Sequence, residues 1–290
     1  MKIAIAGATG NIGARIVQQL AKSAHKLVLL SRNIEAETQL KNDNIALLNT
    51  DIANKEQVIT NTKGVDALFW MVPPLMHVSC LKDLYQEVTS AGVEAVKENK
   101  IKKVVLLSAI GAGAKEHLGT VSYVGDMEKA FDTLNDVDVL ALRPGYFMEN
   151  FLSQKELIVQ NGIFNFPYDP EHDIPFISTD DIADAAAKYL VDEQWSGHWK
   201  LHLMGKENLT MTQIAQLFSK HLNKTVRYEQ VSINHFENLF RSFGANEVVI
   251  EEMVELFEAL GDPDGVYALP RTFETTTATS FSKFIQQKFK

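Results

Sequence analysis

The sequence predicts an α/β fold, in which a doubly wound parallel sheet carries a smaller C-terminal α+β lobe. Short runs rich in Val, Ile and Leu alternate with segments of helical periodicity through the first half of the chain. These runs show no apolar–polar alternation, which is typical of strands buried on both faces. A glycine-rich turn joins the first run to the first helix. Such alternation implies parallel strands with right-handed crossovers.

The expected elements can be placed in order. The runs that predict strands are residues 3–6, 27–30, 46–48, 67–71, 104–107 and 139–142. Helices are expected to begin near Ile12, Lys55, Leu75 and Val121. After residue 150 we expect helices at 180–191, 211–222 and 246–260, short strands at 200–203 and 226–228, and irregular aromatic stretches at 161–168 and 173–176. We expect these later segments to close over the carboxyl ends of the strands, where ligands of such folds bind.

The composition is that of a globular protein. The 290 residues are 46% hydrophobic and 22% charged, and no stretch reaches the roughly 18 unbroken apolar residues of a membrane span. The N-terminus is a strand with one lysine, unlike a secretory signal. A net charge of −9 argues against direct binding of nucleic acid or anionic membrane. The single cysteine, Cys80, fits a reducing cytoplasm, where we expect the protein, and we interpret it as a small apolar side chain on a helix.

The opening MKIAIAGATGNIG predicts a dinucleotide-binding turn between the first strand and the first helix. Gly7 permits the tight turn, and Gly10 lets the backbone approach a pyrophosphate. Gly13 lets the helix pack closely on the strand, while the N–H groups of the helix start attract the anion. The alternative is that these are ordinary turn glycines. The spacing GxxGxxG is one residue longer in its first half than GxGxxG.

The end of the second strand favours NADP over NAD. An NAD site usually places an acidic residue there to hold the ribose hydroxyls, whereas this strand runs into Ser31 and Arg32. The Arg32 guanidinium can form paired, charge-assisted hydrogen bonds with a 2′-phosphate. Asp51 and Ile52 follow the third strand, where an adenine would be held. Asp51 could equally cap the next helix.

These residues, together with Leu142-Arg143-Pro144-Gly145 and the run from Ile177 to Ala183, resemble the NmrA-like group of atypical short-chain dehydrogenase/reductases. The group includes NADPH-dependent quinone oxidoreductases and NADP-sensing regulators. The resemblance implies a Rossmann NAD(P)-binding domain at 1–150 and a smaller substrate or partner lobe at 151–290, partly interleaved with it. It places Gly7, Thr9, Asn11 and Ile12 at the pyrophosphate and Arg32 at the 2′-phosphate.

The catalytic pattern departs from that of ordinary short-chain dehydrogenases, which use Tyr-x-x-x-Lys to tune a phenol. Tyr123 is followed four residues later by Met127. If Glu128 is aligned with the glutamate that often follows the motif, the tyrosine position falls on Thr120 and the lysine position on Val124. Neither register restores the pair, so we interpret Tyr123 and Lys129 as surface residues of a helix. Ser108 occupies the place of the usual serine or caps the following loop.

Hydride transfer to a quinone or similar conjugated acceptor needs mainly positioning. The strand ends expected to face the nicotinamide supply Trp70, Met71, Val72, Pro73, Pro74, Ser108, Ala109, Gly145, Tyr146, Phe147 and Asn150. Of these, Tyr146, Phe147 and Asn150 are the expected positioning residues, while Val72, Pro73 and Ser108 are expected beside the cofactor. With Phe164, Phe166 and Phe176 they predict an apolar, aromatic site for a flat substrate. The alternative is that these aromatics are ordinary core residues.

The histidines and the clustered carboxylates do not predict a metal site or a further catalytic site. The eight histidines include no His-x-x-x-His and no cysteine partner at ligand spacing, so no metal is expected. Asp180 and Asp181 are interpreted as N-terminal charges of a helix. The carboxylates of Glu251, Glu252, Glu255 and Glu258 form a stripe on the helix expected at 246–260. We interpret this stripe as solvated, with docking of a regulatory partner as the alternative; a homodimer is also open.

Two functions fit these observations. The first is an NADPH-dependent reductase that transfers hydride to a quinone or similar small conjugated acceptor. The alternative is a non-catalytic NADP(H)-binding sensor that reports redox state to a partner protein. The missing tyrosine and lysine favour the sensor, whereas the aromatic strand ends and the compact chain favour the reductase. A sugar-nucleotide epimerase is disfavoured because that chemistry normally relies on the absent pair.

Overall fold

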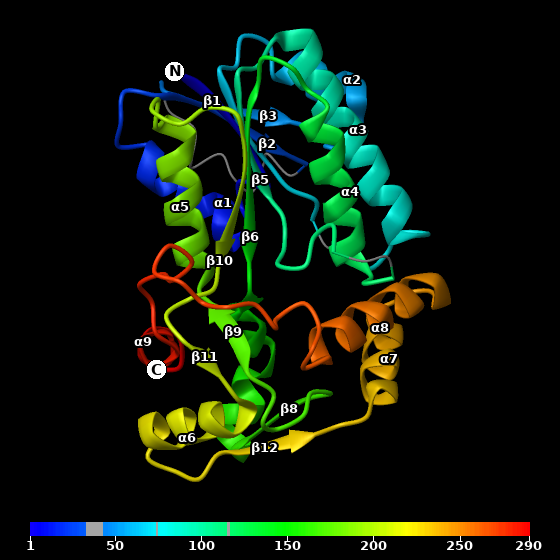
Figure 1. The fold of residues 1–290 in the computed structure, drawn as a ribbon, viewed down its shortest axis with the longest axis vertical. Coiled ribbons are helices and arrows are strands. Elements are labelled where there is room, and N and C mark those ends of the chain that lie inside the picture. The colour runs from blue at the N-terminus through cyan, green and yellow to red at the C-terminus, as the bar shows by residue number, and fades with distance from the viewer. Residues whose placement is uncertain (33–42, 74, 115–116) are drawn as a thin grey trace.

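A seven-stranded parallel sheet forms one half of the molecule in the computed structural model, which describes residues 1–32, 43–73, 75–114 and 117–290 (Figure 1). The strand order is β10-β6-β5-β4-β1-β2-β3. The strands are β1 (Lys2–Ala6), β2 (Lys26–Ser31), β3 (Ile45–Asn49), β4 (Ala67–Trp70), β5 (Lys103–Leu107), β6 (Asp138–Pro144) and β10 (His198–Leu203). All six pairings are parallel, so the strands end at one edge. The predicted doubly wound sheet is confirmed.

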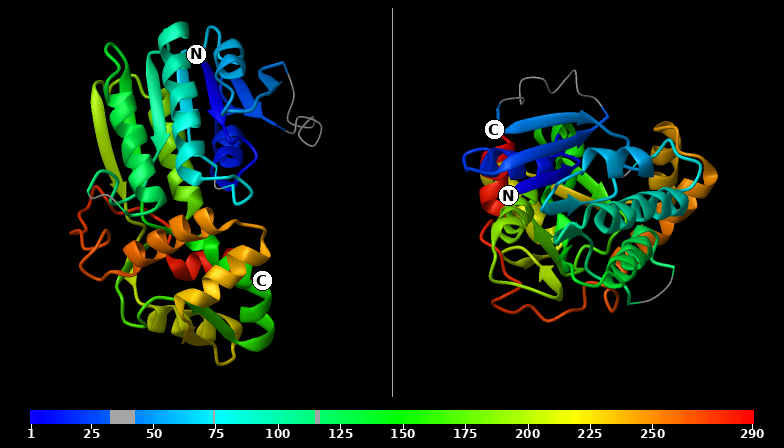
Figure 2. Two further views of the ribbon diagram at one scale, coloured as in Figure 1. Left: turned by 90° about the vertical axis from the view of Figure 1, so that its right-hand side faces the viewer. Right: turned by 90° about the horizontal axis from the view of Figure 1, so that it is seen from above.

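Helices cover both faces of this sheet (Figures 1 and 2). On one face lie α1 (Asn11–Leu20) and α5 (Thr179–Val191), whose apolar sides share a core cluster with β1 residues such as Ile3 and Ile5. On the other lie α2 (Lys55–Asn61), α3 (Leu81–Asn99) and α4 (Thr120–Asp132), packed over a second cluster. Within the described residues, no helix combines the length and apolarity needed to cross a membrane.

The start of α3 corrects one prediction. The sequence placed a helix start near Leu75, but α3 begins at Leu81 after an extended Cys80 with φ −157°. Cys80 is therefore the N-cap rather than a residue within the helix, and its side chain does not cap the helix N–H groups. The acceptor for these groups comes from Glu252 of a distant helix, so the start depends on tertiary structure.

The smaller lobe lies at the carboxyl ends of the strands (Figure 1). Its strands are β7 (Tyr146–Phe147), β8 (Ile163–Phe166), β9 (Ile174–Ile177), β11 (Asn208–Leu209) and β12 (Arg227–Gln230). Its helical segments are η2 (Met148–Gln154), η3 (Leu157–Asn161), α6 (Met211–Leu222), α7 (Ile233–Ser242), α8 (Glu247–Gly261) and α9 (Phe281–Lys288). The stretches expected to be irregular at 161–168 and 173–176 thus contain β8 and β9. Each spans only four residues and owes its order to pairing with strands remote in sequence.

Candidate functional site

The glycine turn after β1 has the shape of a phosphate cradle. Gly7 adopts φ +65°, which a residue with a side chain rarely does, and its carbonyl accepts a hydrogen bond of 3.0 Å from the Gly10 N–H. A Cβ added to Gly13 would stand 2.2 Å from the Gly7 oxygen. Gly10 is the N-cap of α1 and supplies no side chain to the helix N–H groups. The ten-residue helix therefore presents these groups to an anion.

Three other residues predicted at this turn differ in their exposure to solvent. Thr9 and Asn11 are exposed, so their polar side chains can reach a bound phosphate. Ile12 is buried against the core of α1 and can offer only its backbone N–H. Both placements agree with a turn that binds through main-chain groups and short polar side chains.

Arg32 and Asp51 follow adjacent strands, since Ser31 of β2 pairs with Asn49 of β3. Arg32 is exposed at the end of β2, and Asp51 is exposed with the half-buried Ile52 beside it. The Asp51 carboxylate accepts a 3.1 Å hydrogen bond from the Ala53 N–H. It does not cap α2.

The cap of α2 is Asn54, whose side chain accepts from the Gln57 N–H at 3.0 Å. The alternative interpretation of Asp51 as a helix cap is therefore wrong. Its position in space beside the end of β2 is compatible with the predicted contact to a nucleoside.

A cavity of about 320 Å³ opens where the sheet ends and the lobe begins. Its walls are Met71, Val72, Tyr85, Leu107, Ser108, Ala109, Ile110, Thr120, Val121, Val124, Pro144, Gly145, Tyr146, Phe147, Asn150, Leu256, Leu260 and Tyr267. The structure thus brings together the predicted ends of β4, β5 and β6 with the predicted positioning residues. Pro73 follows Val72 and is half-buried, and Pro74, expected at the same strand end, lies outside the described residues. The cavity is mostly apolar and wide enough for a flat ring system.

Sequence reasoning missed the walls contributed by helices and by the C-terminal half. Tyr85 comes from α3, Leu256 and Leu260 come from α8, and Tyr267 lies in the segment after α8. No local motif marks these positions, because each is an ordinary apolar or aromatic residue of an amphipathic segment. Thr120 and Val124, the residues aligned with the missing tyrosine and lysine, line the cavity as well.

Four aromatic residues expected at the site lie in the core instead. Phe164, Phe166 and Phe176 are at most 3% exposed and pack edge-on around Phe151 within the lobe. Trp70 is fully buried and stands directly over Gly92 of α3, where an added Cβ would come within 2.6 Å of the indole. The interpretation of these four side chains as core residues is therefore correct, and Phe147 is the one phenylalanine that lines the cavity among the described residues.

Ser108 is tied into a buried ion pair. Its hydroxyl donates to Glu128 at 2.5 Å, and Arg143 donates to both oxygens of the same carboxylate at 2.9 and 2.5 Å. Glu128 is only 2% exposed. The bidentate guanidinium compensates the buried negative charge. Ser108 therefore does not cap the following loop; its proton is directed away from the cavity.

Tyr123 and Glu252 join α3, α4 and α8. Glu252 is 7% exposed and accepts hydrogen bonds from the Leu81 and Lys82 N–H groups at 2.7 and 2.9 Å. The Tyr123 hydroxyl donates to the same carboxylate at 2.9 Å. Burial, followed by this carboxylate, raises the pKa of the Tyr123 phenol. Glu252 is thus no part of a solvated stripe, and Tyr123 is half-buried between helices rather than on the surface.

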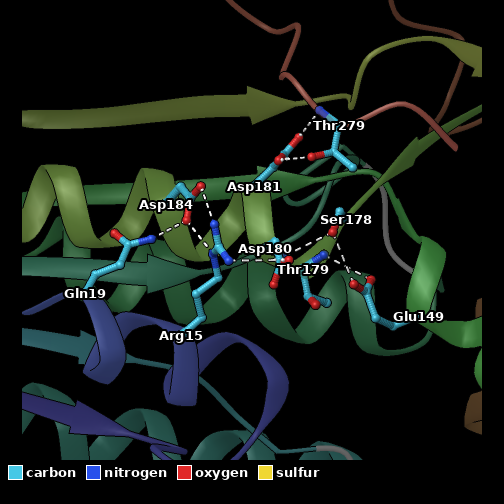
Figure 3. Close-up of polar contacts among 9 residues, drawn as sticks. All are labelled: Arg15, Gln19, Glu149, Ser178, Thr179, Asp180, Asp181, Asp184 and Thr279. Atoms are coloured by element: carbon cyan, nitrogen blue, oxygen red, sulfur yellow. Dashed lines mark hydrogen bonds and ion pairs between the residues drawn. The ribbon is translucent and has the colours of Figure 1, made fainter. Parts of the chain in front are cut away.

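A second polar network ties α1 to α5 and α5 to the C-terminal segment (Figure 3). Arg15 of α1 donates to both oxygens of Asp184 at 2.6 and 2.9 Å and lies 3.4 Å from Asp180. Asp181 is buried and accepts 2.9 and 2.6 Å bonds from the N–H and hydroxyl of Thr279. The two aspartates stand in the first turn of α5 as predicted, and they also hold neighbouring segments.

The start of α5 is held from the lobe side as well. Glu149 accepts hydrogen bonds from the Ser178 hydroxyl and the Thr179 N–H at 3.2 and 3.0 Å (Figure 3). Ser178 is the N-cap and accepts from the Asp180 N–H. The helix start is therefore fixed to η2, which follows the cavity residue Phe147.

Comparison with known proteins adds the following findings. The model of the NmrA-like family matches residues 1–289. The prestalk A differentiation protein A of Dictyostelium discoideum is 24% identical over 97% of this chain and 93% of its own length. An NAD(P)H azoreductase of Xenophilus azovorans is 24% identical over 97% of this chain and 96% of its own. An NADPH-dependent quinone oxidoreductase of Escherichia coli, solved with NADPH, superposes with a TM-score of 0.81 at 22% identity, covering 99% of this chain and 100% of that one.

Proposed function

The chain belongs to the NmrA-like family, and on that premise we propose that it is an NADPH-dependent reductase of quinones or similar small conjugated acceptors. The names of two similar proteins, an NAD(P)H azoreductase and an NADPH-dependent quinone oxidoreductase, support the class of reaction. The observation that carries the proposal is the apolar cavity at the carboxyl ends of β4, β5 and β6. It adjoins the edge of the sheet where the glycine turn lies.

The residues present fit NADPH. A Cβ on Gly13 would collide with the Gly7 carbonyl, so the three glycines let α1 begin close against the turn, with its N–H groups placed to meet a pyrophosphate. Thr9, Asn11 and the backbone of Ile12 complete that contact. In this proposal the exposed Arg32 holds the 2′-phosphate.

In this proposal, residues at the carboxyl ends of the strands also contact the adenine and nicotinamide ends of NADPH. Asp51 and Ile52 follow β3 at the adenine end. Val72, Pro73 and Ser108 follow β4 and β5 at the nicotinamide end. Bound NADPH supplies the hydride.

The chain's own contribution to the reaction is positioning and exclusion of water. Phe147 and Tyr146 present an aromatic surface on which a flat acceptor can stack, and Asn150 supplies an amide at the same wall. Leu256 and Leu260 of α8 close the opposite side with apolar surface. Proximity and orientation of this kind lower the barrier without a strong protein acid.

Loss of NADPH absorbance in the presence of benzoquinones and naphthoquinones tests the proposal. We expect saturable turnover with several members of the panel. Replacement of Phe147 or Asn150 by alanine should slow it, since each removes a wall of the acceptor site. Absence of turnover across the panel would contradict the proposal.

The second candidate, a non-catalytic NADP(H) sensor, is favoured by one observation. The helix that follows the glycine turn is linked through Arg15 and Asp184 to α5, and α5 is linked through Asp181 to Thr279 (Figure 3). A change at the cofactor turn therefore has a polar route to the C-terminal segment. A sensor must also bind NADPH and NADP⁺ with different affinities in its two conformations. Cofactor-dependent proteolysis of the lobe, without quinone turnover, would support it.

A further inference from the structure

Helix α8 supplies one wall of the apolar cavity through two leucines. Leu256 and Leu260 are four residues apart, so their side chains lie on one face of the helix, and both are half-buried. Glu252 lies one turn earlier on the same face. The position of this face therefore determines how much room an acceptor has.

Two anchors fix α8 against the first half of the chain. Glu252 accepts hydrogen bonds from the Leu81 N–H, the Lys82 N–H and the Tyr123 hydroxyl at 2.7, 2.9 and 2.9 Å. The side-chain amide of Asn246, the N-cap of α8, donates to the carbonyls of residues 78 and 79 at 2.8 and 3.1 Å. The two leucines follow these anchors in the same helix, so an outward movement of their wall would break these bonds.

The backbone of α8 also lies directly against the start of α4. A Cβ added to Gly119, the N-cap of α4, would stand 2.4 Å from the Glu252 carbonyl oxygen and 2.8 Å from the Leu256 nitrogen. A residue without a side chain permits this approach. It brings the Leu256 backbone beside Thr120 and Val121, which line the same cavity.

The lobe wall of the cavity is equally confined. Tyr146 is buried, and its ring packs edge-on against those of Phe166, Tyr168 and Phe176 at centroid distances of 5.9, 5.9 and 5.5 Å. A ring packed in this way cannot swing aside without opening a hole in the core, which destabilises the fold. Neither wall can therefore move apart to admit a larger ligand without loss of stability.

The volume of the cavity is small for two ring systems. It is about 320 Å³, near the lower end of the roughly 300–1,000 Å³ of sites that bind drug-sized ligands. In the proposed function the nicotinamide ring, beside Val72 and Ser108, takes up part of this volume. The remainder suits a flat acceptor of one or two fused rings.

We propose that Leu256 and Leu260 set the upper size limit of the acceptor at two fused rings, which rests on the proposed reductase function. A third fused ring meets the two leucine side chains before the acceptor reaches the nicotinamide. Hydride transfer then fails, because it needs the reacting atoms about 3–3.5 Å apart. The protein accordingly reduces benzoquinones and naphthoquinones and excludes wider polycyclic quinones.

Two ortho-quinones that differ by one fused ring test the proposal, namely ortho-naphthoquinone and phenanthrenequinone. The measured quantity is the ratio of kcat/KM for phenanthrenequinone to that for ortho-naphthoquinone at saturating NADPH. The variants are Leu256→Ala and Leu260→Ala, with Val254→Ala as the matched control. Val254 is a half-buried residue of α8 that packs on the same core as the two leucines but does not line the cavity.

In the unmodified protein this ratio should be at most about one tenth, since a single methylene group too many in an apolar pocket already lowers kcat/KM by about 10- to 200-fold. Each leucine variant should raise the ratio by at least about tenfold, whereas Val254→Ala should change it only slightly. A gain of activity toward the larger quinone cannot come from partial unfolding. A ratio near one in the unmodified protein, or a ratio that stays unchanged in either leucine variant, would overturn the proposal.

Calorimetric binding of the two quinones to the protein with NADP⁺ separates the size limit from the reaction. The unmodified protein should bind ortho-naphthoquinone at least about tenfold more tightly than phenanthrenequinone, and Leu260→Ala should remove most of this difference. If the unmodified protein turns over neither quinone, the proposed reductase function fails, and the binding comparison decides the size limit by itself. Equal affinities of the unmodified protein for the two quinones would contradict that limit.

Discussion

The proposed preference for NADPH over NADH depends on Arg32. Arg32 is exposed at the end of β2, where no carboxylate precedes it in the strand, and its guanidinium suits a phosphate dianion. Loss of a charge-assisted hydrogen bond reduces affinity by about 10- to 100-fold. Arg32→Ala should therefore weaken NADPH by that factor and leave NADH nearly unchanged. Calorimetric titration of both cofactors against both proteins measures this, and equal affinities in the unmodified protein would refute the role of Arg32.

Tyr123 is not expected to take part in proton transfer. Its hydroxyl donates to Glu252, and burial raises its pKa above that of an ordinary phenol, so it is protonated at neutral pH. Tyr123→Phe should leave turnover within a few-fold of the original. A general acid contributes about 100-fold or more, so a loss of that size at saturating NADPH would identify Tyr123 as the proton donor.

Single residues also show where sequence reasoning ends. The tight turn at Gly7, Gly10 and Gly13 could be predicted because its geometry is local to a few residues, while its role in cofactor binding stays a prediction. The bond between Ser108 and Glu128 could not, since it joins β5 to α4. Glu252 was misinterpreted for the same reason: its neighbours along α8 are carboxylates, whereas its partners are N–H groups at residues 81 and 82.

The carboxylate of Glu252 joins helix α8 to helices α3 and α4. Glu252→Gln would leave an amide N–H facing backbone N–H groups that now share an anionic acceptor. We expect a loss of about 1–3 kcal/mol in the free energy of unfolding. Glu251→Gln, on the exposed side of the same turn, should change it by less than about 0.5 kcal/mol. Equal denaturation midpoints for the two variants would show that the buried carboxylate does not stabilise the helix junction.

The strands of the central sheet could be predicted from the sequence, whereas several elements of the smaller lobe could not. The strands of the central sheet are continuous apolar runs, and each predicted run falls within or beside an observed strand. Strands β8 and β9 escaped prediction because their order depends on partners remote in sequence, and helices α7 and α9 were not predicted either. The aromatic residues near β8 and β9 suggested a ligand site, but their rings form the lobe's core. The division of the chain at residue 150 stays a prediction.

For the whole molecule, buried phenols predict loss of stability at alkaline pH. Burial raises the pKa of Tyr85 to about 12 and those of Tyr146, Tyr168 and Tyr267 above the ordinary value. A phenol that ionises near pH 10 when unfolded stabilises the fold fully below that pH and progressively less as pH rises toward the folded pKa. Tyr85 alone accounts for a loss of about 2 kcal/mol by pH 12.

Denaturant titrations across this range measure the effect. The free energy of unfolding should fall steadily above about pH 10. Tyr85→Phe should reduce the slope, because it removes one of the buried titrating groups. A free energy independent of pH up to about 12 would contradict the burial of these side chains.

For the whole molecule, we propose that the glycine turn at the edge of the sheet binds the dinucleotide and that the apolar cavity beside the lobe holds the acceptor. The most direct test is a single-turnover experiment, in which protein saturated with NADPH is mixed with excess naphthoquinone. We predict complete oxidation of the bound NADPH in one phase, with a rate that saturates in quinone and falls when deuterium replaces the transferred hydrogen. Bound NADPH that survives at every quinone concentration would contradict the account.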